Sequence, residues 1–222
     1  MRASVFAFTC GTRVLRVVTA ALAVALAPAI AGAQFSGLFN TGVDGSNVKL
    51  ALGATDSHYR VVENALSQAF VVNNGAYVQD ATSGYIWQQA DGNPGNVTRT
   101  FRTTFTLATG FNPLTAMLSG QWSTDNTGLN IMLNGIASGS ASAGFGSFTA
   151  FSITNGFVVG LNTLDFVVND AGAPGGLDVR GLSGTASRIG TPTTVPEPST
   201  VVLLTAGLAG LAVASSRRKR RA

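Results

Sequence analysis

Cysteine, histidine and charged residues are scarce in this chain of 222 residues, which has one cysteine, one histidine and only 11% charged residues. The single cysteine, Cys10, cannot form a disulfide within the chain. The lone histidine, His58, excludes a His-rich metal site, and no Gly-x-Ser-x-Gly motif offers a serine nucleophile to pair with it. A domain without cross-links must owe its stability to a hydrophobic core.

Basic residues are also scarce between the two ends of the chain. Of the 14 Lys and Arg residues, three precede residue 17 and five lie within 217–221. Residues 34–195 therefore hold six basic and nine acidic residues, a net charge of −3. The net charge of +4 for the whole chain comes from its ends, and a mildly acidic central domain disfavours nucleic-acid binding.

Residues 1–33 are typical of a secretory signal peptide. Three arginines precede the apolar, Ala-rich run 17–30, and Ala31-Gly32-Ala33 fits the small-x-small pattern that signal peptidase cleaves. We expect cleavage after Ala33, so that the mature chain begins at Gln34. An uncleaved N-terminal anchor is the alternative.

Three elements follow one another at the C-terminus. A Pro-Glu-Pro element comes first, in a linker expected over 191–199, and an apolar helix is expected over 200–216. A helix over 200–215 extends roughly 24 Å against roughly 30 Å of bilayer hydrocarbon, so its length alone is marginal. The basic cluster that follows favours a stop-transfer anchor, with 217–222 as a cytoplasmic tail. The residues involved are Val195, Pro196, Glu197 and Pro198, then Arg217, Arg218, Lys219, Arg220 and Arg221.

The order of these three elements resembles the PEP-CTERM sorting signal of bacteria that make exopolysaccharide. The resemblance covers 195–222. It implies that a membrane-embedded exosortase recognises the Pro-Glu-Pro element and processes the tail. It also implies an exported protein of the envelope, surface or extracellular matrix of a Gram-negative-type bacterium.

Residues 34–190 are expected to form one all-β domain, an antiparallel β-sandwich. The sequence is rich in Gly, Asn, Thr, Ser, Val and Phe, without a long segment of helical periodicity. Apolar residues alternate through 97–107, and Asn134-Gly135 is a favoured hairpin turn. The expected strands are 58–62, 68–72, 76–79, 85–88, 97–107, 116–124, 129–133, 148–153, 162–168 and 177–182, and 135–146 is expected to be a flexible loop.

A longer pattern within 116–169 resembles galactose-binding-like jelly-roll domains. An aromatic strand and an Asp-containing turn at 116–126 precede the hydrophobic-Asn-Gly hairpin at 131–135. The strand 160–166, Gly-Leu-Asn-Thr-Leu-Asp-Phe, follows. The resemblance implies the fold and carries over no set of sugar contacts, because the fold hosts binding and enzyme-accessory roles alike.

Acidic residues offer the remaining route to catalysis or to a metal site. Glycoside hydrolysis needs two carboxyl groups about 5–9.5 Å apart, and most of the candidates lie beside Gly or Asn, where turn formation also explains them. Clustered oxygen ligands at 44–47 and 125–127 make a structural calcium ion an option, although neither segment matches a complete calcium loop. We expect no other cofactor. The candidate acids are Asp44, Asp56, Asp80, Asp91, Asp125, Asp165, Asp170 and Asp178.

Aromatic side chains are the best candidates for a ligand-binding surface. Tyr85 and Trp87 share one strand face, and Trp122 precedes the turn at Asp125 and Asn126, so exposed rings there could stack on sugars. Core packing is the alternative for both tryptophans. The phenylalanines, Phe148 among them, are expected in the core or clamping turns.

These observations favour a non-catalytic surface or matrix protein that binds carbohydrate, such as the producer's own polysaccharide. The partners expected during export are signal peptidase, exosortase and the membrane. A structural or adhesion protein acting through protein–protein contacts is the alternative, followed by a glycan-acting enzyme.

Overall fold

The computed structural model describes residues 34–190, 204–209 and 217. The expected signal peptide 1–33, with Ala31 and Ala33 of its cleavage site, lies outside the described residues, as does the linker 191–199 with its sorting motif. Of the expected membrane helix, 204–209 is described and is helical. Within the described residues, no helix combines the length and the hydropathy needed to cross a membrane.

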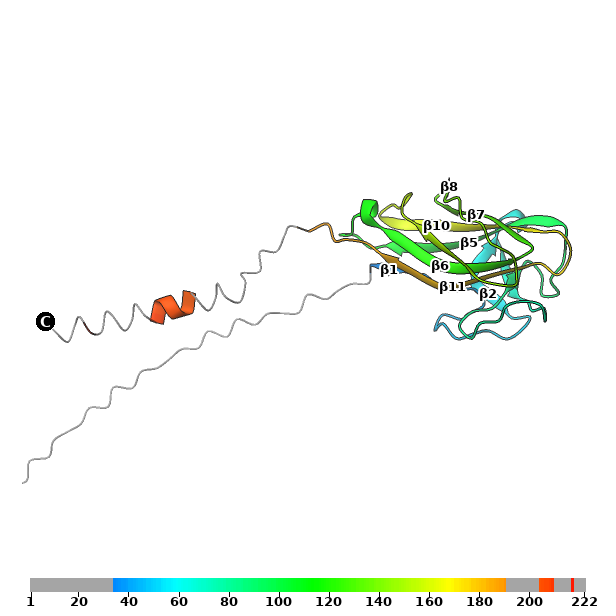
Figure 1. The fold of residues 1–222 in the computed structure, drawn as a ribbon, viewed down its shortest axis with the longest axis horizontal. Helices are drawn as coiled ribbons and strands as arrows, with labels where there is room; N and C mark the ends of the chain where they lie inside the picture. Colours follow the sequence, from blue (N-terminus) through cyan, green and yellow to red (C-terminus); the bar gives the residue numbers. More distant parts are fainter. Residues whose placement is uncertain (1–33, 191–203, 210–216, 218–222) are drawn as a thin grey trace, which may run out of the picture. The chain divides into compact units, whose positions relative to one another are not determined.

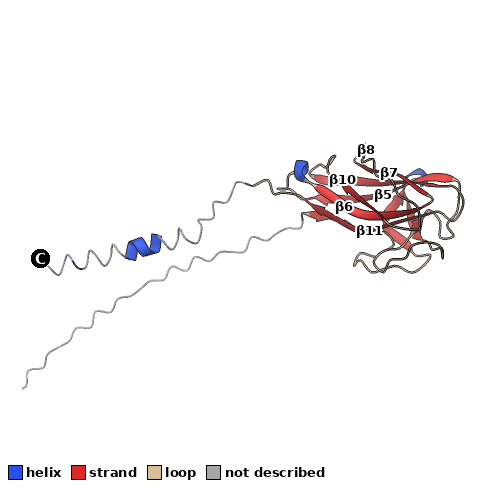
Figure 2. Ribbon diagram, in the orientation of Figure 1, coloured by secondary structure: helices blue, strands red, loops and turns tan. Residues whose placement is uncertain are grey.

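Residues 34–190 form an all-β domain, as the sequence predicts (Figure 1). Every pairing between its strands is antiparallel. The strands are β1 (Phe35–Ser36), β2 (Thr55–Val61), β3 (Ser67–Val71), β4 (Ile86–Trp87), β5 (Val97–Leu107), β6 (Met117–Asp125), β7 (Thr127–Leu133), β8 (Ile136–Ala137), β9 (Thr149–Ile153), β10 (Gly160–Asp170) and β11 (Gly176–Thr185). The short 3-10 helices η1 (Val62–Asn64) and η2 (Pro113–Thr115) are the other regular elements of this domain (Figure 2).

The strands follow one continuous hydrogen-bonded path that forms two facing layers. The order is β8-β7-β10-β5-β2-β3-β4-β11-β6-β9, with β1 paired to β5. Trp122 of β6 contacts Phe166 of β10 with ring centroids 5.8 Å apart, and Phe151 of β9 meets the same ring at 5.9 Å. Because β6 and β9 do not pair with β10, these rings join two layers, which makes the domain a sandwich.

One hydrophobic core fills the space between the layers. It contains the inward-facing residues of the long strands, and the two tryptophan side chains are fully buried within it. Among the described residues, every core residue lies within 34–190, so this segment has a core of its own and can be studied by itself.

Two expectations for local structure differ from the structure. Residues 76–79 form a turn and loop instead of a strand, because their hydrogen bonds go to other loops, such as Val78 N–H to the Phe145 carbonyl at 2.9 Å. The tract 135–146 is held against the sheet, since it contains β8 and since Ser142 N–H donates to the Gly128 carbonyl at 3.0 Å. The other expected strands are present within a few residues of their predicted bounds.

Candidate functional site

Strands β6 and β11 carry a row of polar side chains on the face that points away from the core. Arg180 pairs in register with Gln121, and Asp178 pairs with Ser123. Because successive side chains alternate between faces, the neighbouring residue Val179 points into the core. A polar sheet face thus backs directly onto the hydrophobic core.

Residues 73–85, which we term the crossing segment, pack over part of this polar face. The Tyr85 and Ser123 hydroxyl groups lie 2.6 Å apart. Further along, the Asp80 carboxylate accepts a hydrogen bond from Arg180 Nη1 at 2.7 Å. These contacts hold the segment against the sheet and leave a groove on one side of it and a cavity on the other.

The groove has a volume of about 500 Å³ and is open to solvent. Five of its nine lining residues have polar side chains, and two are glycines. The lining residues are Asp80, Thr82, Ser119, Gly120, Gln121, Ala150, Phe151, Arg180 and Gly181.

Arg180, one of the residues that line this groove, is held in place by three other side chains. Its Nε donates to Gln121 Oε1 at 2.8 Å, and its Nη1 donates to the carboxylate of Asp80. The guanidinium carbon lies 3.8 Å from the centre of the Phe148 ring, a cation–π contact. The Arg180 side chain nevertheless remains 31% exposed. Its orientation is therefore fixed while part of its charged surface stays accessible.

Asp80 is ionised at neutral pH in this environment. Burial alone would raise its pKa, but hydrogen bonds from Thr82 and from the Arg180 guanidinium outweigh that cost, so the pKa lies below its ordinary value. The groove thus presents a carboxylate and a guanidinium side by side, with an amide and hydroxyl groups around them. Such a set can both donate and accept hydrogen bonds.

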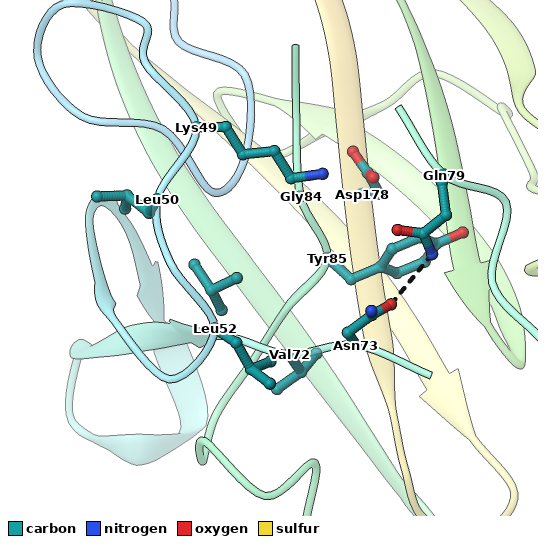
Figure 3. Close-up of a pocket in the computed structure, with 10 residues that line it drawn as sticks. Lys49, Leu50, Leu52, Val72, Asn73, Gln79, Gly84, Tyr85 and Asp178 are labelled. Carbon is teal, nitrogen blue, oxygen red and sulfur yellow. Dashed lines mark hydrogen bonds between the residues drawn. The ribbon is translucent and has the colours of Figure 1, made fainter. Parts of the chain in front are cut away.

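The cavity on the other side of the crossing segment measures about 140 Å³ (Figure 3). Apolar side chains from 50–52 and 71–72 form one wall, and polar groups form the other. Lys49 Nζ donates to the Asp80 main-chain carbonyl at 2.7 Å, and Gln79 Nε2 donates to Asn73 Oδ1 at 3.0 Å. The lining residues are Lys49, Leu50, Leu52, Val71, Val72, Asn73, Gln79, Gly84, Tyr85 and Asp178.

Asp178 is the buried acid of this cavity, with 1% of its surface exposed. Burial raises its pKa to about 6, and hydrogen bonds from Ser83 and Thr41 together with the Lys49 charge limit the rise. Its pKa is thus displaced in the opposite direction from that of Asp80.

The aromatic platform predicted from the sequence is wrong, because all three rings are buried. Trp87 and Trp122 have no exposed surface and Tyr85 has 2%. The Trp87 ring packs on Phe101 with centroids 5.4 Å apart, while the Tyr85 hydroxyl is engaged with Ser123. Their faces cannot stack on a sugar, so replacing these residues would test the core instead of ligand binding.

Asp125 and Asn126 also lie away from the groove lining. The Asp125 carboxylate accepts from the Tyr77 hydroxyl at 3.0 Å, and Asn126 Oδ1 accepts from Ala171 N–H at 2.6 Å. Both side chains therefore hold the chain together where β6 and β10 end.

Most of the other acidic candidates have structural roles. Asp44, Asp91 and Asp170 each accept a main-chain N–H two residues further along, which is the turn chemistry expected for them. Asp165 forms a two-pronged ion pair with Arg102, with both N–O distances 2.7 Å. Across the described ranges, no three side chains of His, Cys, Asp or Glu converge in a way that could hold a metal ion.

His58 does not form a catalytic pair with Asp56. The Asp56 carboxylate accepts the main-chain N–H of His58 at 2.7 Å, and the imidazole stacks on Phe39 with centroids 3.7 Å apart. The imidazole therefore packs against an aromatic ring, beside a carboxylate that is committed to the backbone.

Sequence reasoning missed Arg180 and Phe148. Phe148 is partly exposed, not buried, and its ring supports the guanidinium. The alternation Leu177, Val179 against Asp178, Arg180 was a usable signal, because it places an arginine on the polar face of a strand. This alternation does not reveal the crossing segment, whose Asp80 precedes Arg180 by 100 residues in the sequence.

Comparisons with known proteins address the fold and the C-terminus. The chain matches no curated protein sequence. Similar solved structures include a family 35 carbohydrate-binding module from Paenibacillus barcinonensis, with 18% identity over 61% of this chain and 100% of the module, at a TM-score of 0.36. A family 35 module from an environmental isolate has 12% identity over 64% of this chain and 95% of the module, at a TM-score of 0.33.

A third similar structure is the GH26-CBM35 β-(1,4)-mannanase of Podospora anserina, with 21% identity over 56% of this chain and a TM-score of 0.31. The match covers 26% of the mannanase chain. At these TM-scores the similarities add no argument to the geometry described above.

The C-terminal match is independent of the fold. Residues 194–219 match the family model of the PEP-CTERM protein-sorting motif, in agreement with the resemblance drawn from the sequence. The chain therefore carries a PEP-CTERM sorting motif, which implies processing by an exosortase and export to the cell surface or envelope.

Proposed function

We propose that this chain is a non-catalytic surface or matrix protein whose sandwich binds carbohydrate in the groove at Arg180. The observation that carries the proposal is the state of Arg180, which is held by Gln121, Asp80 and Phe148 and yet remains accessible. An ion pair that stays partly open to solvent contributes on the order of 1 kcal/mol to stability, so folding gains little from this arrangement. A binding site gains more, because a fixed side chain loses less entropy when a ligand arrives.

The chemistry of the groove suits a neutral polyhydroxylated ligand. Each sugar hydroxyl can donate one hydrogen bond and accept others, and the groove offers both kinds of partner. Arg180 donates, the Asp80 carboxylate accepts, and the Gln121 amide can do either. With one cation beside one anion, the groove has no net charge that would demand a charged ligand.

A glycan-acting enzyme is the second candidate, and one observation favours it. Asp80 has a lowered pKa while burial raises that of Asp178 to about 6. Two carboxyl groups with separated pKa values are typical of glycosidases. Asp178, however, is 1% exposed and lines the smaller cavity, whereas Asp80 lines the open groove. We therefore keep the non-catalytic proposal.

The test is a titration of residues 34–190 with the extracellular polysaccharide of the producing organism and with a panel of neutral and acidic glycans. Arg180→Ala should weaken binding by about 10-fold to 100-fold, the cost of losing a charge-assisted hydrogen bond. Arg188→Ala is the matched control, because Arg188 also stacks on a phenylalanine, Phe111, at 4.8 Å and lies outside the groove lining. It should bind as the wild type does.

Two outcomes would change the proposal. If the folded wild-type domain binds no glycan, a structural or adhesion role through protein–protein contacts replaces the proposed carbohydrate binding. If the wild-type domain degrades the polysaccharide and Asp178→Asn abolishes this activity, the proposal of a glycan-acting enzyme replaces that of a non-catalytic binding protein.

The finer features of export belong to the same proposal. We propose that the signal peptide is cleaved after Ala33 and that a helix over 200–216 spans the membrane before the tail is processed. We also propose that the producer is a Gram-negative-type bacterium and that its exopolysaccharide is the ligand of the sandwich, a galactose-binding-like jelly roll. The Pro-Glu-Pro element and the small-x-small sequence at 31–33 support the two processing steps. N-terminal sequencing of the secreted chain, with Gln34 as the expected first residue, tests the first of them.

A further inference from the structure

The chain enters and leaves the sandwich at the same end, which we term the tether end (Figure 1). Strands β5 and β11 finish there, and β6 and β10 begin there. The Gln34 carbonyl accepts from Ala108 N–H at 3.0 Å, and the Gln34 side chain accepts from Ala186 N–H at 2.8 Å. At the other terminus of the domain, Ile189 N–H donates to the Gly110 carbonyl at 2.6 Å. The residues before 34 and those after 190 are therefore attached to one end of the sandwich.

Exposed apolar side chains gather at the tether end. Leu114 of η2 is 88% exposed, and Leu161, the second residue of β10, is 66% exposed. Soluble monomers rarely expose apolar patches without a partner for them. More than half of the large apolar side chains that residues 34–190 expose lie here, namely Leu114, Ile136, Val158, Val159, Leu161 and Ile189.

The fold brings the segments that carry these side chains together. The Phe35 ring of β1 lies 6.1 Å from the Phe157 ring of the β9–β10 loop, and on its other side it packs against Gly184 of β11. Ser187 N–H donates to the Thr115 hydroxyl of η2 at 2.9 Å. The apolar residues of η2, of the β9–β10 loop and of the segment after β11 therefore surround the same end of the sandwich.

The tether end carries one charge, and this charge is positive. Its segments contain no acidic residue and one basic residue, Arg188, which is exposed and forms no ion pair within the described part of the chain. At the opposite end, Asp125 and Asp170 are the last residues of β6 and β10. An anionic surface would thus attract the tether end more than the rest of this acidic domain. The segments of the tether end are 34–38, 107–117, 133–137, 153–161 and 184–190.

The length of the chain keeps the tether end close to the membrane. From Gly190 to Thr200, where the proposed membrane helix begins, a fully extended chain covers at most about 36 Å. On the N-terminal side, Gln34 follows closely on the apolar run 17–30 of the expected signal peptide. A tethered domain needs only weak affinity in order to dock, because the tether makes binding an intramolecular event.

We propose that the tether end docks on the surface of the lipid bilayer. The exposed apolar side chains enter the interface, and Arg188 pairs with the phosphate of an anionic headgroup. Burial of apolar area and attraction to anionic lipids are the two contributions that drive interfacial binding. The inference rests on the membrane helix proposed at 200–216, which supplies the tether, and it does not depend on the carbohydrate groove.

The first test measures how deeply single labels lie in the membrane. The expected mature chain has no cysteine, so unprocessed 34–222 can be labelled with a fluorophore at Val159→Cys or at Gly172→Cys alone. Gly172 is the matched control, since it follows β10 at the opposite end and a methyl group there would meet no atom within 4 Å. In vesicles of equal parts phosphatidylcholine and phosphatidylglycerol that contain a quencher-bearing lipid, the label at 159 should be quenched and the label at 172 should not.

The second test changes single side chains of the docking surface. Leu161→Ser should weaken the binding of residues 34–190 to the same vesicles about 10-fold, since one leucine side chain no longer leaves water. Leu129→Ser is the control and should bind as the wild type does, because Leu129 is an exposed leucine near the opposite end of β7. Arg188→Glu should weaken binding to these vesicles more than binding to vesicles of phosphatidylcholine alone.

The outcomes distinguish the tether from the docking surface. If the unprocessed chain does not float with the vesicles, the membrane helix is wrong and the docking proposal fails with it. If the chain floats and the label at 159 is quenched no more than the label at 172, the helix stands and the docking surface is wrong. Equal binding of vesicles by Leu161→Ser and the wild type would also overturn it. A lipid-free dimer that Leu161→Ser dissociates would assign the apolar end to a second copy instead. None of these results alters the glycan titration.

Discussion

Buried carboxyl groups are the residues of this domain with the most distinctive electrostatics. Asp56, Asp170 and Asp178 are each at most 1% exposed, and burial raises the pKa of all three. Hydrogen bonds from the backbone and from hydroxyl groups limit the rise without reversing it. These acids consequently bind a proton more tightly than an ordinary aspartate does, whereas the pKa of Asp80 is lowered.

Asp178 allows this effect to be measured at one residue. Its pKa is about 6 in the folded state, against an ordinary value of 3.8 for an aspartate in the unfolded chain. Below pH 3.8 both states carry the proton, whereas between pH 3.8 and 6 only the folded state keeps it. The stabilisation is therefore fully present at low pH and is lost as the pH rises through 6. The loss amounts to about 3 kcal/mol.

Asp178→Asn cannot titrate and should not show that loss. Between pH 4 and pH 7, the free energy of unfolding of the variant should rise relative to that of the wild type by about 2 kcal/mol, because part of the loss has already occurred at pH 4. Urea denaturation at several pH values, with a chelator present, measures the difference. Parallel profiles for the two proteins would contradict the assignment.

At the scale of elements, the β7–β8 hairpin joins turn chemistry to the rest of the fold. Asn134 and Gly135 have φ values of 51° and 82°, as a two-residue hairpin turn requires. The Asn134 amide also donates to the Asn162 side chain and to the Gly156 carbonyl, both at 2.8 Å. The turn therefore anchors the short edge strand to the start of β10.

Gly135→Ala should destabilise the domain by about 1–2 kcal/mol. A methyl group at this position would meet no atom within 4 Å, so the cost comes only from the left-handed backbone conformation. Gly135→Asn should cost less, because Asn tolerates that conformation. Gly146→Ala is the control, since Gly146 has equally open surroundings and no positive φ, and it should be close to neutral. Equal stability of Gly135→Ala and Gly146→Ala in urea denaturation would exclude this explanation.

At the scale of the whole molecule, sorting and folding are carried by separate parts of the chain. The hydrophobic core of the described residues lies within 34–190, and the sorting motif occupies 194–219. Changes to the motif should alter processing and location while the sandwich stays folded.

Replacing Pro196 and Glu197 together by Ala should prevent processing of the tail. The chain isolated from the producing organism should then keep its C-terminal residues, and mass spectrometry of the purified chain measures this directly. Pro192→Ala, which lies upstream of the matched motif, is the control and should be processed normally. Processing of the double variant at the wild-type level would mean that the Pro-Glu-Pro element is not what the exosortase recognises.

The sequence by itself determined the features that depend on neighbouring residues. Alternation through 97–107 defined β5 at its observed bounds, Asn134-Gly135 defined a turn, and the order of elements after 194 defined the sorting motif. Each of these signals lies within about a dozen residues, where backbone preferences and side-chain alternation act directly.

Only the tertiary structure decided which side chains a ligand can reach. Alternation separates the two faces of a strand but does not reveal which face another segment covers, so Trp87 and Trp122 could be placed wrongly at the surface. The groove at Arg180 exists because residues 73–85 cross β6 and β11, and Asn126 meets Ala171 because two strand ends converge. Such contacts join residues 45 to 100 positions apart, and packing of the whole core selects them.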